Sequence, residues 1–245
     1  MLTAFFWAFV ASGSLLIGGL LALNIRFSKR ALGMIMAFGA GTLLSAVAYE
    51  LMLDAIKESA GTGIVAAGFG IGAGVFFGLD RWIEMAGAGR RKAIGASHKS
   101  SLVVPLVLAI ILDGIPESTV VGLSILDGGN VGIAMLIAVF ISNLPEAIAS
   151  TAGMKEGNWG GTRIMLLWLI ITLVCAASAA LGYALLGDAP TIWLSFVKAF
   201  AAGAILMMLA NTMIPEAYNH GGKLSGVFTV LGFGLSVGVV LLERG

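Results

Sequence analysis

Residues 102–126 read LVVPLVLAIILDGIPESTVVGLSIL, and residues 130–153 read NVGIAMLIAVFISNLPEAIASTAG. Each stretch is long and apolar enough to cross the roughly 30 Å hydrocarbon core of a membrane as one helix. Each also carries polar side chains and a proline in its middle. A carboxylate at that depth costs about 2.5–3.5 kcal/mol on insertion scales, so it usually faces a cavity, a partner or an ion.

The composition of the whole chain agrees with a membrane protein. Of its 245 residues, 59% are hydrophobic and 11% are charged, whereas soluble domains contain about 25% charged residues. The single cysteine, Cys175, excludes an intrachain disulfide and a thiolate cluster. A net charge of +1 gives no sign of a nucleic-acid partner.

Eight apolar runs predict an all-α membrane protein with eight transmembrane helices. We expect a single transmembrane domain covering residues 1–245, because no soluble domain fits between the runs. The expected spans lie at about 2–24, 31–54, 62–80, 102–126, 130–153, 164–187, 191–215 and 224–242.

The distribution of basic residues predicts the orientation in the membrane. Basic side chains concentrate in loops on the cytosolic side. The loops after the first, third, fifth and seventh spans hold eleven of them: Arg26, Lys29, Arg30, Arg81, Arg90, Arg91, Lys92, Lys99, Lys155, Arg163 and Lys223. The opposite side has only Lys57 and Arg244. We therefore expect both termini on the outer side of the cell membrane.

An internal repeat relates the second and seventh spans. Residues 38–55 align without gaps on residues 200–217, and the alignment matches Asp54 with Glu216. The two spans run in opposite directions, which predicts an inverted repeat of three, two and three helices, as is typical of secondary transporters. Chance similarity between two helices rich in Ala, Gly and Leu is the alternative.

Small residues four apart allow helices to approach closely. They occur on one face of the third span, at Gly70, Gly74 and Gly78, and on one face of the eighth, at Gly234 and Gly238. We expect these faces to serve a packed scaffold or a homodimer interface.

The polar residues of the two central spans fall on shared helix faces. Asp113 and Glu117 are four residues apart, as are Ser142 and Glu146, and Asn143 is three residues from Glu146. The short loop between the spans predicts an antiparallel hairpin that brings the two sets to the same depth. Three neighbouring carboxylates repel one another unless a cation or protons lie between them. The pattern favours a divalent-cation site, and a proton relay without a metal is the alternative.

Prolines add backbone oxygens to this pattern. Pro116 and Pro145 lack the N–H that would bond the carbonyls of Leu112 and Ile141. Freed carbonyls inside a membrane need water, a hydroxyl or a cation. We expect kinks at these two prolines and at Pro215 in the seventh span.

Further charges inside the predicted spans indicate a route for cations. Glu50 and Asp54 lie in the outer part of the second span, and Glu216 lies at the inner end of the seventh. We expect them to attract and release cations; acids that simply reach water at the interface are the alternative. Lys198 could pair with Glu50 or Asp54, or extend to the interface.

At these positions the chain resembles the ZIP (Zrt/Irt-like) family of divalent metal transporters. The family pattern His-Asn-x-Pro-Glu reads here as residues 113–117, and the fifth-span pattern ending in x-Pro-Glu reads as residues 142–146. The ending Met-Ile-Pro-Glu-Ala at 213–217 is also similar to that family. Three departures stand out: Asp113 replaces the histidine, Gly114 replaces the asparagine, and the sixth span contains no acidic residue.

The resemblance implies a transporter rather than an enzyme. Metal ligands would be Asp113, Glu117, Asn143 and Glu146, with Ser142 near them, in one site rather than a fully equipped pair. Zinc, iron or manganese would enter the cytosol by alternating access, as substrate and not as a cofactor. The lipid bilayer and a second copy of the chain would be the partners. An all-oxygen ligand set weakens the preference for zinc. A proton-coupled carrier of another solute, using the same acids, is the alternative function.

Overall fold

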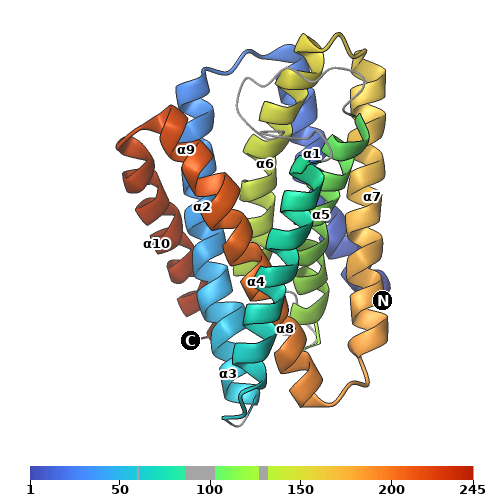
Figure 1. The fold of residues 1–245 in the computed structure, drawn as a ribbon, viewed down its shortest axis with the longest axis vertical. Helices are drawn as coiled ribbons and strands as arrows, with labels where there is room; N and C mark the ends of the chain where they lie inside the picture. Colours follow the sequence, from blue (N-terminus) through green and yellow to red (C-terminus); the bar gives the residue numbers. More distant parts are fainter. Residues whose placement is uncertain (60, 86–102, 127–131, 245) are drawn as a thin grey trace.

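The computed structural model describes residues 1–59, 61–85, 103–126 and 132–244, and in these ranges helices are joined by short loops and turns. Long helices run up and down the bundle in Figure 1. The α-helices are α1 (Leu2–Asn24), α2 (Lys29–Ala46), α3 (Leu53–Glu58), α4 (Ile64–Ile83), α5 (Val103–Ser124), α6 (Ile133–Glu156), α7 (Gly161–Leu186), α8 (Thr191–Met208), α9 (Ile214–Gly221) and α10 (Leu224–Arg244). Two π-helical stretches, η1 (Val47–Met52) and η4 (Leu209–Met213), follow α2 and α8.

Seven helical segments of the described residues are long and apolar enough to cross a membrane. The fourth expected span, 102–126, corresponds to α5, a helix of 22 residues. Six of the eight expected runs begin and end within three residues of an observed helix. Four of the basic residues that predict the orientation, Arg90, Arg91, Lys92 and Lys99, lie outside the described residues.

The second and seventh expected spans are longer in the structure than the sequence predicts. Lys29–Glu58 forms one continuous segment of 30 residues and Thr191–Gly221 one of 31, in place of 31–54 and 191–215. Each segment remains helical through its π stretch. The polar residues after the π stretch therefore belong to the same continuous helical segment. The ends predicted from the apolar pattern come too early, because the last turns of both segments carry charged side chains.

The π stretches bond in the wider π pattern. At the end of η1 the N–H of Leu53 donates to the carbonyl of Ala48, and at the end of η4 the N–H of Ile214 donates to Leu209. Pro215, where a kink was expected, lies in the first turn of α9 directly after η4. Because η1 contains no proline, a proline is not needed to form such a stretch in this chain.

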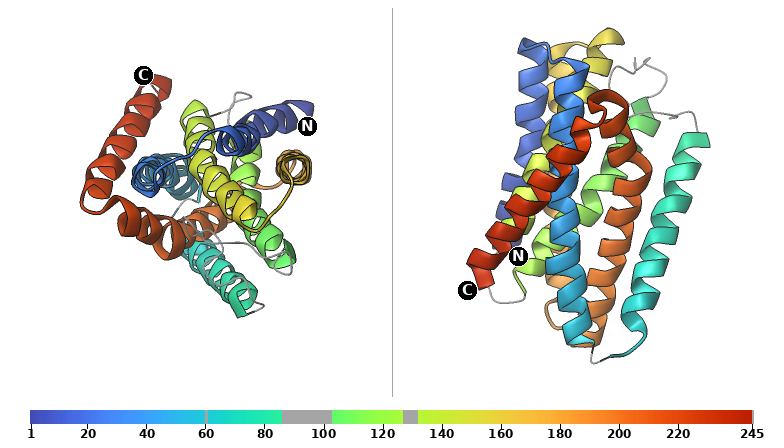
Figure 2. Two further views of the ribbon diagram at one scale, coloured as in Figure 1. Left: turned by 90° about the horizontal axis from the view of Figure 1, so that it is seen from above. Right: turned by 90° about the vertical axis from the view of Figure 1, so that its left-hand side faces the viewer.

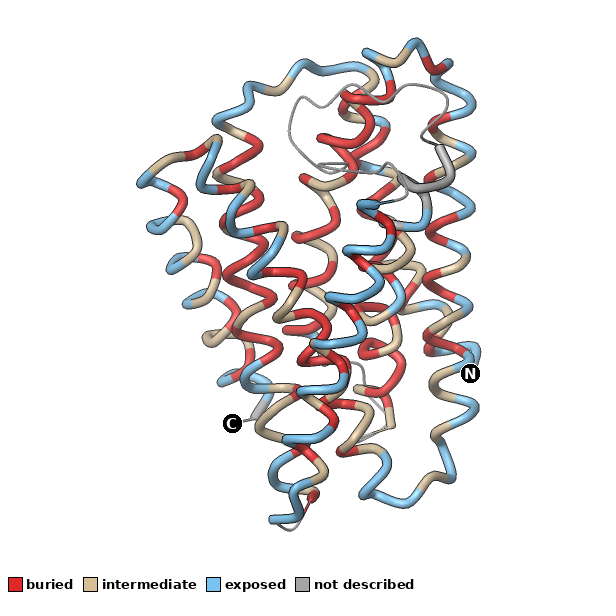
Figure 3. The backbone as a smooth tube through the Cα atoms, in the orientation of Figure 1, coloured by how far each residue is buried: buried red, intermediate tan, exposed pale blue. Residues whose placement is uncertain are grey.

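The helices pack in two groups that meet at α2 and α6. In one group α1 packs on α6 and α7, and α5 packs on α7; in the other α4 packs on α8, and α10 packs on α2. Figure 2 shows α4 and α10 at the periphery of the bundle. By contrast, α2 and α6 are the most buried spans and are mainly red and tan in Figure 3.

Glycines permit backbone contact inside the second group. A Cβ on Gly41 of α2 would meet the carbonyl oxygen of Thr229 in α10, and one on Gly203 of α8 would meet that of Phe69 in α4. The glycines that the sequence suggested for packing do not serve this purpose. A Cβ on Gly70, Gly74, Gly78, Gly234 or Gly238 would meet nothing within 4 Å, so those faces point away from the chain's own helices.

Side chains secure two helix ends. Ser28 precedes α2 and its Oγ accepts from the N–H of Ala31 at 3.1 Å. The Lys155 ammonium, near the end of α6, donates to the last carbonyls of α1 at Ala22 (3.1 Å) and Leu23 (3.0 Å). A cation there also complements the negative end of the α1 dipole. This pair of bonds ties α6 to α1 at one end of the bundle.

Candidate functional site

A small cavity lies where the two helix groups meet. Asp113 and Glu117 of α5 and Ser142 and Glu146 of α6 line it, together with residues of α2, α8 and η4. Its volume is about 20 Å³, and a single water needs about 10–15 Å³ by the same measure. The space therefore suits one particle the size of a water molecule or a metal ion.

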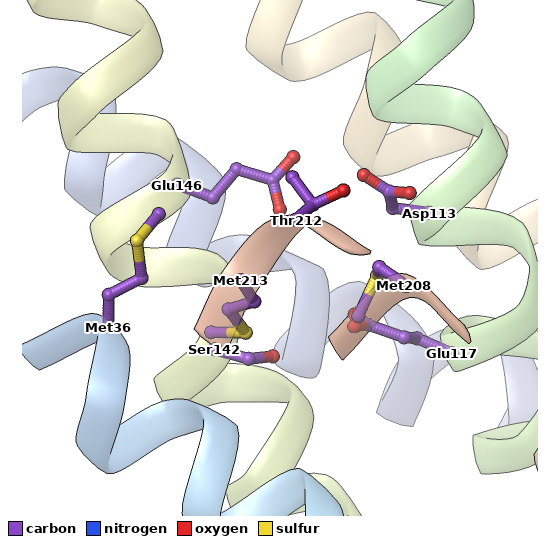
Figure 4. A pocket seen from close by; sticks show the side chains of 8 residues that line it. All are labelled: Met36, Asp113, Glu117, Ser142, Glu146, Met208, Thr212 and Met213. Carbon is purple, nitrogen blue, oxygen red and sulfur yellow. The ribbon is translucent and has the colours of Figure 1, made fainter. Parts of the chain in front are cut away.

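The carboxylates of this cavity are withdrawn from the surface. Asp113 is 4% exposed and Glu117 is 2% exposed, while Glu146 is half-buried. Figure 4 shows the carboxylates of Glu146 and Asp113 pointing toward each other across Thr212. The hydroxyl of Ser142 donates to the carbonyl of Val139 at 3.0 Å, which leaves its oxygen able to accept or to bind a cation.

The helical spacing explains why these four side chains meet. Residues four apart on α5 and on α6 share a face, and both faces turn toward the junction with α2 and α8. Pro116 and Pro145 lie inside α5 and α6, as the sequence indicated. They place the polar residues next to backbone that cannot complete its helical bonding.

Asn143 is the expected ligand that the structure does not bring to the cavity. Its side chain is buried, at 5% exposure, but it is not among the lining residues. It follows Ser142 directly, and neighbouring residues of a helix point in directions about 100° apart. Of the two, only Ser142 lines the cavity in this structure.

The opposite wall of the cavity was missed by the sequence analysis. It consists of Met36 of α2, Met208 of α8, and Thr212 and Met213 of η4. Methionines in apolar helices usually fill gaps in the core, so their type alone does not mark a site. The repeat aligns Thr212 with Glu50, but Glu50 does not line the cavity, so the repeat does not mark this wall.

The carboxylates border the cavity without forming a closed coordination sphere. Across the described residues, no three His, Cys, Asp or Glu side chains converge closely enough to hold a metal ion. The lining instead mixes carboxylate, hydroxyl and thioether groups. Such a set can bind a cation weakly and reversibly, or exchange protons.

Cys175 of α7 lies behind the acidic wall. A Cβ on Gly114 would come within 2.7 Å of its sulfur, and Cys175 is buried. The thiol therefore occupies space that a side chain at position 114 would need. This contact gives a physical reason for glycine at the position where the similar family has asparagine.

The residues expected along a route lie away from the cavity lining. Asp54 is 3.9 Å from Lys57, and Glu216 is 3.2 Å from the Nδ1 of His220. Glu50 is half-buried in η1. They occupy the continuous helical segments that carry the π stretches.

Lys198 has a partner that the sequence analysis did not consider. Its ammonium lies 2.6 Å from Oε1 of Glu58, and the lysine side chain is 2% exposed whereas that of Glu58 is 24% exposed. The pair joins α8 to the end of α3. A buried lysine needs such a partner, because an uncompensated charge inside apolar surroundings is strongly destabilising.

Comparison with known proteins adds one relative. The chain is 27% identical over 192 residues, 77% of its length, to an Arabidopsis thaliana protein named "Putative zinc transporter". It spans about 30% of that protein's length. No family model matches the chain. The similarity and the apolar helices together indicate an integral membrane protein related to a metal transport protein.

Proposed function

We propose that this protein carries divalent transition-metal cations across a membrane, and that it is a divergent member of the ZIP family. The observation that carries the proposal is the cavity where Asp113, Glu117, Ser142 and Glu146 meet in the interior of an apolar helix bundle. Charged side chains inside membrane helices commonly mark ion pathways. The similarity to the Arabidopsis protein supports a metal as the cargo.

The ligand types bear on which metal is carried. Carboxylate and hydroxyl oxygens suit manganese and other hard cations, whereas thioethers favour softer ones. The sequence suggested oxygen ligands alone, but Met36, Met208 and Met213 border the same space. We propose zinc, iron or manganese as the substrate, with the methionines favouring zinc and iron over magnesium and calcium.

Several features support an inverted repeat as the basis of transport. The alignment that pairs Phe38 with Phe200 also pairs the first residue of α2 with that of α8, and likewise their last residues. Each helix then enters a π stretch. Gly72 of α4 meets the carbonyl of Phe200, and Gly232 of α10 meets that of Phe38. We propose that α5 and α6 move against α2, α4, α8 and α10 in alternating access.

Transport by purified protein in liposomes tests the proposal. We expect zinc, iron or manganese to accumulate down a gradient in liposomes that contain the protein. Glu117→Gln and Glu146→Gln should each reduce uptake by at least about tenfold. Asp188→Asn, in the exposed turn before α8, is the matched control and should leave uptake unchanged. Equal uptake by all four proteins would contradict the role of the cavity.

A proton-coupled carrier of another solute is the second candidate, because buried carboxylates also form proton relays. The liposome assay separates the two if the interior also contains a pH indicator. Metal transport predicts saturable uptake of the ion with or without a pH gradient. A relay predicts proton movement that depends on Glu117 and Glu146 while no metal accumulates.

The orientation and the assembly also belong to this proposal. We propose both termini on the outer side of the cell membrane, which labelling of terminal tags in intact cells can check. A homodimer would use the outward-facing glycines of α4 or α10. The mass of the detergent-solubilised protein, measured by light scattering, would show one copy or two.

A further inference from the structure

The end of α10 contacts the beginning of α6 through one carboxylate. Oε1 of Glu243 accepts a hydrogen bond from the N–H of Ile133 at 2.5 Å, and Oε2 accepts one from the N–H of Ala134 at 3.2 Å. The two partners are 110 and 109 residues away along the chain. Nothing in the sequence pattern of either span indicates this contact.

This carboxylate supplies a cap that α6 lacks locally. The residue before the helix is Gly132, which has no side chain to accept from the first N–H groups. Those groups need an acceptor, and a negative charge at that end also interacts favourably with the helix dipole. Glu243 satisfies both needs, but it is exposed. Water can therefore take over the two hydrogen bonds when the helices separate.

The capped helix is the one that carries half of the cavity. Ile133–Glu156 is a single helix of 24 residues that contains Ser142 and Glu146. At 1.5 Å per residue, Glu146 lies about 20 Å along the axis from Ile133. The helix continues without interruption through Pro145 over that distance, so we expect a displacement of its first turn to reach the cavity residues.

The two ends of α6 are attached to different helix groups. At its C-terminal end Lys155 binds the last carbonyls of α1, and α1 packs along α6 over most of its length. At its N-terminal end Glu243 comes from α10, which packs mainly on α2. Any movement of α6 together with α1 relative to α2 and α10 must stretch or break the Glu243 contact, while the Lys155 contact can persist.

We propose that Glu243 is a positioning residue that holds the N-terminal end of α6 against α10 and is released in each transport cycle. This inference rests on the proposed function, because it assigns a step to the movement of the cavity. In the state described by the structure the contact is made and that end of α6 is held. In the opposite state the first N–H groups of α6 are bonded to water instead.

A reversible covalent link at this contact tests the proposal. Cys175→Ser gives a cysteine-free background, and Ile133→Cys with Glu243→Cys places two thiols at the contact. Ile133 is 49% exposed, so a short bifunctional thiosulfonate reagent can reach it. We expect linked protein in liposomes to lose metal uptake and to regain it when a reductant cleaves the link. The two single-cysteine proteins, treated identically, should keep their uptake.

A second variant keeps the test independent of the cysteine pair. Glu243→Gln retains one acceptor oxygen but loses the charge, and it touches no cavity residue. We expect its maximal uptake rate to change by about threefold, the effect of removing one charge from a helix end. Its apparent KM for the metal should remain that of the natural protein. If Glu243 only stabilised the fold, Glu243→Gln would lower the amount of active protein. The maximal uptake rate per active molecule would then stay unchanged.

The outcomes separate this inference from the proposed function. Full uptake by linked protein, or an unchanged rate in Glu243→Gln, would overturn the role of Glu243 while uptake that depends on Glu117 remains. If the natural protein moves no metal, the proposed function fails, and the assignment of Glu243 fails with it. Loss of uptake on linking and recovery on reduction supports both.

Discussion

The two walls of the central cavity differ in chemistry and in backbone. The wall from α5 and α6 carries three carboxylates on regular α-helices that contain internal prolines. The wall from α2, α8 and η4 carries three methionines and Thr212, and part of it is π-helical. The acidic wall supplies the negative charge that attracts a cation, whereas the thioether and hydroxyl groups of the other wall are neutral. We infer that a cation would stay with α5 and α6 when the two helix groups move apart.

Removing the charge from the acidic wall should have the largest effect. Asp113→Asn combined with Glu117→Gln keeps the shapes of the side chains but leaves only Glu146 charged. We expect metal affinity to fall by at least about 100-fold, since even partners one layer behind a metal ligand cost about 10–100-fold. Binding of zinc to the purified protein, followed by titration calorimetry, measures this change. A smaller loss than in the methionine variants below would reverse the assignment of the two walls.

The pair of Lys198 and Glu58 lies in the same helix group as the thioether wall but outside the cavity. Lys198→Met removes a buried charge whose partner is partly exposed. Breaking a fully buried pair costs about 3–5 kcal/mol, and exposure reduces this, so we expect a loss of about 2 kcal/mol. Thermal unfolding in detergent should show the lower stability, and Glu58→Gln in addition should restore part of it. Unchanged stability would mean that the pair of Lys198 and Glu58 does not stabilise this helix group.

The methionines should change selectivity more than total transport. In Met208→Leu combined with Met213→Leu the volume of each side chain is nearly preserved while the sulfur is lost. We expect the preference for zinc over manganese to fall by up to about tenfold, because thioethers favour the softer ion. Competition between the two ions in liposome uptake measures the ratio. An equal loss for both ions would show that these side chains only pack.

Gly114 offers the finest test, because it concerns what supports the acidic wall. In Gly114→Ala the new methyl group meets the Cys175 sulfur, and overpacking of this kind costs about 1–3 kcal/mol, partly offset by the better helix propensity of alanine. Adding Cys175→Ala should relieve the contact and turn the net loss into a small gain. Thermal unfolding of the two variants checks the change of sign. The same sign in both would show that Cys175 does not limit this position.

Much of the acidic wall could be predicted from the sequence, because its geometry is local. Residues four apart share a helix face, so Asp113 with Glu117 and Ser142 with Glu146 follow from spacing alone. The same reasoning could not choose between Ser142 and Asn143. That choice depends on how α6 is rotated against α2, and rotation is set by packing.

The other wall could not be predicted, since it is created by tertiary contacts. Met36 and Thr212 come from helices far apart in the sequence, and a methionine in an apolar span has no distinctive pattern. The π stretches were also missed, because a shift from four-residue to five-residue bonding leaves no mark in hydropathy. The Glu58 partner of Lys198 was overlooked because the expected second span stopped at residue 54, one turn too early.

The π stretches have a consequence for how each long segment is wound. One additional residue in a helical turn rotates everything beyond it by about 100° compared with an uninterrupted α-helix. Glu216 and His220 beyond η4, and Asp54 and Glu58 beyond η1, therefore face where they do because of that extra residue. Deleting a single residue from either stretch would rotate the part of the segment beyond it and turn the acidic side chains there toward different neighbours. The apolar part of the span before the stretch would keep its orientation.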